Sequence, residues 1–201
     1  MNRLSILLLL LTIAFPVLAA GQQFPAFRVS TTEIKGLTVS QTAKMKRAAI
    51  LFENVLNDTE FQKELETETF KSDRNDDLIQ DPTARQVIKR IYAAGELYKP
   101  EPNNVADIYW YSKNEGFWKR LTDKCTTIGF GYPGEKEIYT YTCLLKEKDS
   151  MAKLVGHIAH EWSHKLGFVH QWDDHAGIYR TVPYVFGDLV AKHAAKWIPH
   201  S

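Results

Sequence analysis

The chain has 201 residues, of which 44% are hydrophobic, 12% aromatic and 24% charged. This composition is typical of a globular domain and excludes a disordered, collagen-like or coiled-coil chain. The formal net charge is only +1, from 25 Lys and Arg against 24 Asp and Glu, and a near-neutral chain without a basic run argues against nucleic acid or an anionic membrane surface as the partner.

The N-terminal segment has the pattern of a secretory signal peptide. An apolar run over residues 4–18 follows a basic residue and ends at the small residues Ala19 and Ala20, an order typical of such signals. We expect residues 1–20 to be removed and the protein to be secreted or periplasmic. Residues 21–201 contain no linker, no repeat and no long apolar run, so we expect a single domain without a membrane span.

Two strands and two helices are expected in the first half of this domain. Strands are expected over residues 27–34 and 108–111. A helix is expected over residues 40–57, with Ser40 as its N-cap. Its apolar side chains recur at helical spacing: Met45, Ala48, Ala49, Phe52 and Leu56. A second helix is expected over residues 81–98, because it begins with an aspartate as N-cap followed by a proline.

Residues 126–132 and 137–142 are expected to form an antiparallel hairpin. Both segments are rich in β-branched and aromatic residues, and the Pro-Gly-Glu between them suits a three-residue connection. Such a connection places Tyr132 opposite Lys136. Because helices and strands interleave and the one clear pairing is antiparallel, the pattern favours an α+β fold with a twisted mixed sheet.

The chain has two cysteines, Cys125 and Cys143. The register expected for the hairpin places them opposite each other across the two strands. In an oxidising compartment such a pair is expected to form a disulfide. The alternative is a pair of buried free thiols.

Histidines are concentrated in one region, where five of the seven lie between His157 and His175. Residues 160–170 match the pattern H-E-x-x-H-x-x-G-x-x-H. The motif residues are His160, Glu161, His164, Gly167 and His170. A match to so many fixed positions is rare by chance and is therefore a strong signal of a metal site.

The spacing of the motif explains how its histidines can meet. A helix turns by about 100° per residue, so His160 and His164 lie on one face, one turn apart. Ser150 can cap this helix, and Gly167 suits a left-handed helix end, after which the chain can bring His170 back. Three neutral histidines leave the fourth tetrahedral position for water, so we expect one catalytic Zn²⁺.

The remaining helix positions support this arrangement. Apolar side chains lie on the opposite side of the helix and are expected to face the core: Leu154, Val155, Ile158, Trp162 and Leu166. Glu161 lies beside the metal position but off its axis, where it can accept a proton from water and deliver it to the leaving amine. The chemistry expected is metal-assisted hydrolysis.

The stretch of residues 160–170 resembles the extended zinc-binding motif of the metzincin metallopeptidases. The resemblance implies a zincin-like fold, in which a mixed sheet lies over the active-site helix and a small C-terminal lobe follows the third histidine. It also implies a peptide or protein substrate that binds along an edge strand of the sheet, for which residues 126–132 and 137–142 are the candidates.

The sequence departs from the metzincin pattern at one point. Metzincins have a methionine turn under the metal, but no methionine follows Met151. The segment 180–184 is the nearest substitute, with Val182 in the place of the methionine. Tyr184 would then lie near the metal as an extra ligand or a donor to the oxyanion, and the alternative is a core or cap residue.

Other polar and aromatic residues of this region have structural interpretations. His157 is expected in the outer shell of the site or at the surface, and His175 is expected in a solvated loop with Asp173 and Asp174, with orientation of a ligand histidine as the alternative. Trp162 and Trp172 are expected to pack. A final helix is expected to contribute its apolar face to the core: Phe186, Leu189, Val190, Ala194 and Trp197.

Together these features predict a secreted, monomeric, zinc-dependent endopeptidase. Two alternatives stay open: an amidase that acts on a non-protein amide, and a non-catalytic binding protein that is stabilised by its metal. The fourth coordination position distinguishes enzyme from binding protein, because only the enzyme needs water there in an open cleft.

Overall fold

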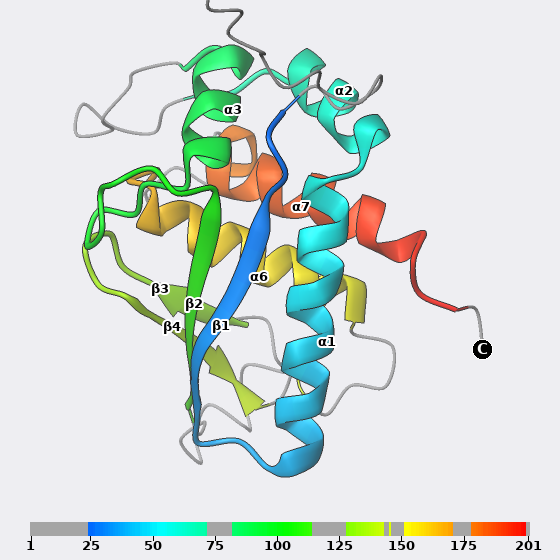
Figure 1. Cartoon of the computed structure of the whole chain (residues 1–201), viewed down its shortest axis with the longest axis vertical. Helices are drawn as coiled ribbons and strands as arrows, with labels where there is room; N and C mark the ends of the chain where they lie inside the picture. The colour runs from blue at the N-terminus through cyan, green and yellow to red at the C-terminus, as the bar shows by residue number, and fades with distance from the viewer. Residues whose placement is uncertain are drawn as a thin grey trace, which may run out of the picture.

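The computed structural model describes residues 24–71, 82–113, 128–142, 145, 151–170 and 178–199. Within these ranges five α-helices pack with a four-stranded mixed sheet (Figure 1), so the α+β prediction is confirmed. Several predicted features lie outside the described residues: the signal segment 1–20, the pair Cys125 and Cys143, Ser150, Trp172, Asp173, Asp174 and His175. None of the described helices is long and apolar enough to cross a membrane.

The sheet has the strand order β1-β2-β4-β3. Strands β1 (Arg28–Lys35), β2 (Val105–Lys113) and β4 (Glu137–Tyr141) run parallel to one another. The short strand β3 (Gly129–Gly131) pairs with β4 in the antiparallel direction and forms one edge of the sheet. Of the two segments proposed to receive a substrate, only the one that contains β3 therefore lies at an edge.

The predicted register of the hairpin is wrong by one residue. Gly131 lies opposite Ile138, and Phe130 lies opposite Tyr139. The predicted pairing of Tyr132 with Lys136 would instead place Gly131 opposite Glu137. The turn between the two strands explains the difference. The Glu135 amide donates a hydrogen bond to the Tyr132 carbonyl, and Gly134 has a left-handed φ of 81°. Pro-Gly at the two central positions gives a four-residue turn with a left-handed glycine in place of the expected connection.

The N-cap of helix α1 (Val39–Leu56) lies two residues before the predicted one. Thr38, not Ser40, is the N-cap, and its side chain and that of Gln41 form a capping box. The predicted apolar stripe is buried. Helix α1 therefore presents the expected face to the core.

The next two helices differ more from the expectation. Helix α2 (Thr59–Thr67) was not predicted, because its acidic sequence resembles a solvated segment; it nevertheless buries Phe61 and Leu65. Helix α3 (Ala84–Ala93) is capped by Thr83 and ends at Ala94, which has left-handed backbone angles. It is thus shorter at both ends than the predicted helix 81–98.

Helices α6 (Met151–Lys165) and α7 (Val182–Ala195) lie side by side, with α6 crossing behind the strands in Figure 1. The 3₁₀ turn η1 (Ile178–Arg180) leads into α7. A Cβ atom on Gly156 of α6 would lie only 2.6 Å from the carbonyl oxygen of Gly187 of α7. The two helices therefore approach each other closely at a pair of glycines.

The core lies between the helices and one face of the sheet. Trp110 and Ile138 of the sheet and Trp162 of α6 are buried there, as alternation along strands with one covered face predicts. In the final helix the predicted core residues are buried except Trp197, which follows α7 and is 49% exposed. The prediction of Trp197 as a core residue is therefore wrong, because the helix ends before it.

Candidate metal centre

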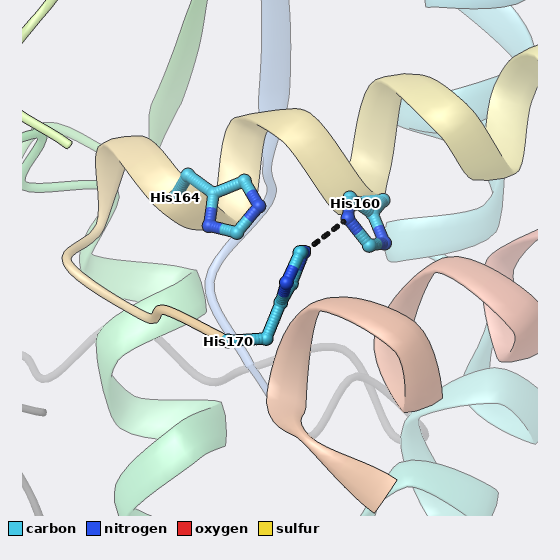
Figure 2. A group of neighbouring side chains, drawn as sticks. All are labelled: His160, His164 and His170. Carbon is cyan, nitrogen blue, oxygen red and sulfur yellow. Dashed lines mark hydrogen bonds between the residues drawn. The ribbon is translucent and has the colours of Figure 1, made fainter. Parts of the chain in front are cut away.

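The three histidines of the motif meet at one point on the side of α6 that faces the cleft. His160 and His164 project from successive turns, the chain reverses at Gly167 (φ = 89°), and His170 returns to face them (Figure 2). One ring nitrogen from each histidine lies within 4.8 Å of the others. The three side chains are thus close enough to bind one metal ion, as the sequence predicted.

The distance between two of the candidate ligand atoms suits a small tetrahedral ion. The Nε2 atoms of His160 and His170 are 3.1 Å apart (Figure 2). Two imidazole nitrogens at 2.0–2.1 Å from one tetrahedral zinc ion would be separated by about 3.3 Å. The spacing of His160 and His170 therefore requires little adjustment to accept such an ion.

Backbone carbonyl groups orient two of these rings. The Nδ1 atom of His164 lies 2.7 Å from the carbonyl oxygen of Phe168, just after the helix end. The backbone of Pro183, in the first turn of α7, accepts a hydrogen bond from His160. A carbonyl group that holds one ring nitrogen directs the other nitrogen of the same ring toward a metal.

Burial keeps the three histidines neutral. Burial lowers the pKa of His164 to about 3 and lowers the pKa of His160 and His170 below the ordinary histidine value. At His160 and His164, repulsion between the rings lowers the pKa further. Neutral imidazole is the form that binds a metal ion. The site therefore presents three ligands in the required protonation state.

Glu161 is buried beside the histidines, with its Oε1 atom 4.0 Å from Nε2 of His160. Burial raises the pKa of Glu161 to about 8, while the charge of Lys165 and a hydrogen bond from the Gly131 amide act in the opposite direction. A carboxyl group with a pKa near neutrality can both accept and donate a proton.

His157 lies inside the protein rather than at the surface. Its Nε2 atom is 3.0 Å from the Thr140 hydroxyl, and its Nδ1 atom is 3.5 Å from Oε1 of Glu161. The Thr140 hydroxyl in turn accepts a hydrogen bond from the indole of Trp110. Burial lowers the pKa of His157 to about 3. A chain of polar contacts thus joins the sheet to Glu161, and His157 is not part of the three-histidine group.

Tyr184 lies against the histidines. Its ring centre is 4.6 Å from that of His160 and 5.0 Å from that of His170. Segment 180–184, proposed as a substitute for a methionine turn, forms the end of η1 and the first turn of α7. Val182 is buried in the hydrophobic core at that turn.

An open cleft of about 460 Å³ contains the histidines and Glu161. One wall is the edge strand β3 with residues 132 and 133, and the other includes Tyr184, Gly187 and Asp188 of α7. An exposed strand edge along a cleft can accept an extended peptide through backbone hydrogen bonds.

Lys165, which was not among the predicted site residues, is fully buried between α6 and the β3–β4 hairpin. Its Nζ atom donates to the carbonyl oxygens of Tyr132 (3.0 Å) and Glu137 (2.7 Å). Burial lowers the pKa of Lys165 to about 8. The one sequence signal was its position four residues after Glu161, on the same face of the helix.

No protein-family model, curated protein or solved structure matches this chain in the comparisons. The function is therefore inferred from the motif and from the geometry of the site.

Proposed function

We propose that this protein is a secreted or periplasmic zinc-dependent endopeptidase with a zincin-like fold, related in its mechanism to the metzincins. The observation that carries the proposal is the convergence of three neutral histidines with a buried glutamate in one open cleft. The signal-peptide pattern of residues 1–20 supports the export of the protein.

The donor set fits zinc. His160, His164 and His170 would hold the ion, which when bound polarises a carbonyl group and makes water more acidic. Carbonyl groups of Phe168 and Pro183 keep two of the rings oriented for this role.

The residues around the histidines supply the other functions that peptide hydrolysis needs. Glu161 accepts the proton of the attacking water and transfers it to the leaving amine. The edge strand β3 pairs with an extended substrate and holds it along the cleft. Tyr184, next to His160 and His170, donates a hydrogen bond to the oxygen on which negative charge develops.

The test is the zinc content of the purified protein combined with hydrolysis of a broad peptide library. Glu161→Gln is expected to keep one zinc ion and to lose at least about 100-fold in kcat, because it removes the proton acceptor. Glu101→Gln, at an exposed loop position, is the matched control and should keep full activity. A zinc-loaded Glu161→Gln variant with undiminished hydrolysis would contradict the mechanism.

A further inference from the structure

Lys165 is unusual because a lysine is rarely buried completely. It is the last residue of α6, and none of its surface is exposed to solvent. Glu161 precedes it by one helical turn, and the charges of Glu161, Glu135 and Glu137 attract its ammonium group. The helix that carries the metal ligands thus ends in a cation that is enclosed by the cleft wall.

The ammonium group of Lys165 connects both arms of the hairpin to α6. Tyr132 follows β3, and Glu137 is the first residue of β4. Their carbonyl oxygens accept hydrogen bonds from the same Nζ atom, at 3.0 and 2.7 Å. Hydrogen bonds from a charged donor are stronger than neutral ones and fix the direction of their acceptors.

Gly131 lies between this ammonium group and the carboxylate of Glu161. A Cβ atom placed on Gly131 would be 3.2 Å from Oε2 of Glu161 and 3.2 Å from Nζ of Lys165. The amide of Gly131 also donates to Glu161. A shift of the hairpin away from Lys165 would therefore move the donor that holds the Glu161 carboxylate.

Stability alone does not explain a charge at this position. Apolar residues in place of the whole buried pair of Lys165 and Glu161 would avoid the cost of removing these charges from water, and replacements of complete buried ion pairs are often neutral or stabilising. What an apolar side chain cannot do is bind two carbonyl groups and set the distance between the hairpin and α6. Lys165 therefore fixes the position of the β3–β4 hairpin relative to α6.

We infer that Lys165 is a positioning residue, which fixes the β3–β4 hairpin against α6 so that the Gly131 amide holds the carboxylate of Glu161 in its working position. The inference rests on the proposed function, in which Glu161 is the general base. Lys165 itself has no contact with the substrate in this role.

Three variants test the inference. Lys165→Met removes the ammonium group and keeps an unbranched side chain, and Lys165→Arg keeps a cation with several N–H donors. Lys46→Met, at an exposed position in the interior of α1, is the control for the same substitution. The measurements are amide hydrogen exchange over residues 129–141 in metal-free protein, zinc content, and kcat and KM for a peptide found in the library screen.

Lys165→Met is expected to keep its fold and one zinc ion, while the hairpin amides, including that of Gly131, exchange faster than in wild type. Its kcat should fall by about 30- to 100-fold, the loss expected when a catalytic group is displaced by roughly 1 Å, and its KM should rise, because the loosened hairpin contains the edge strand β3 that binds the substrate. Lys165→Arg should recover most of the lost kcat, and Lys46→Met should match wild type.

Unchanged hairpin exchange in Lys165→Met would overturn the inference, and so would wild-type kcat. Global unfolding of Lys165→Met together with Lys165→Arg would also overturn it, because Lys165 would then be a general stability residue. If wild-type protein hydrolyses no peptide, the proposed function fails, but the exchange comparison still shows whether Lys165 positions the hairpin.

Discussion

The close approach of α6 and α7 makes a quantitative prediction for Gly156→Ala. A Cβ atom at this position would lie 2.6 Å from the Gly187 carbonyl oxygen and 2.8 Å from the Cβ atom of Ala191. Non-bonded carbon atoms are stable at about 3.5–4.0 Å, so α7 would have to withdraw by roughly 0.7–1 Å. Both obstructing atoms belong to a helix and cannot rotate away.

The expected change in stability is the balance of two effects. Overpacking of a rigid contact costs about 1–3 kcal/mol, whereas alanine in place of glycine in a helix interior contributes about 1 kcal/mol of stability. Because both contacts of Gly156 are rigid, we expect a net loss of about 1–2 kcal/mol in the free energy of unfolding. Urea unfolding of the metal-free protein, followed by circular dichroism, measures this difference.

Gly187→Ala is the comparison variant from the facing helix. Its Cβ atom would meet the Gly156 carbonyl oxygen at 3.0 Å and the Cβ atom of His160 at 3.1 Å. The smaller overlaps predict a smaller loss of stability than in Gly156→Ala, but a direct effect on His160 and hence on zinc affinity. A Gly156→Ala variant that is more stable than wild type would refute this account of helix packing, because only the helix-propensity gain would then be present.

Two further predictions concern metal binding and pH. Zinc should raise the Tm of the wild-type protein as its concentration increases and should leave the Tm of His164→Ala nearly unchanged; equal shifts measured by calorimetry would exclude His164 as a ligand. Hydrogen bonds from Lys192 and, to a smaller extent, from His193 lower the pKa of Glu64 in the folded protein. The contribution of Glu64 to the free energy of unfolding is therefore present above its unfolded pKa of about 4.3 and is lost as the pH falls through the folded pKa. Glu64→Gln should therefore lower the free energy of unfolding at pH 7 by up to about 1 kcal/mol, and a gap of the same size at pH 2 in urea unfolding would contradict this explanation.

Local patterns predicted the histidine group well, because its geometry is largely determined within eleven residues. The pair His160 and His164 follows from helical periodicity, and the return of His170 follows from the left-handed glycine at position 167. The start of α1 was misplaced by two residues, because Thr38 and Ser40 are both good N-caps and only the capping box with Gln41 distinguishes them.

Features that depend on distant contacts were not predictable in the same way. The burial of Lys165 depends on the carbonyl groups of residues 132 and 137, and these reach it only through the pairing of β3 with β4. Helix α2 contains an N-cap at Asp58 and apolar residues at helical spacing, but its acidic composition obscured them. A position of Tyr184 near the metal was expected only from the metzincin resemblance, with a core or cap residue as the alternative, because its contact with the histidines depends on the packing of α7 along α6, which no local pattern contains.

The contribution of α7 to the centre has a consequence for the order in which the protein becomes functional. The carbonyl group that orients His160 belongs to Pro183, and the ring that covers His160 and His170 belongs to Tyr184. A nascent chain that has been synthesised only as far as His170 contains every histidine of the group but lacks these supports. The histidine group therefore gains these supports only after α7 has also been synthesised and has packed against α6.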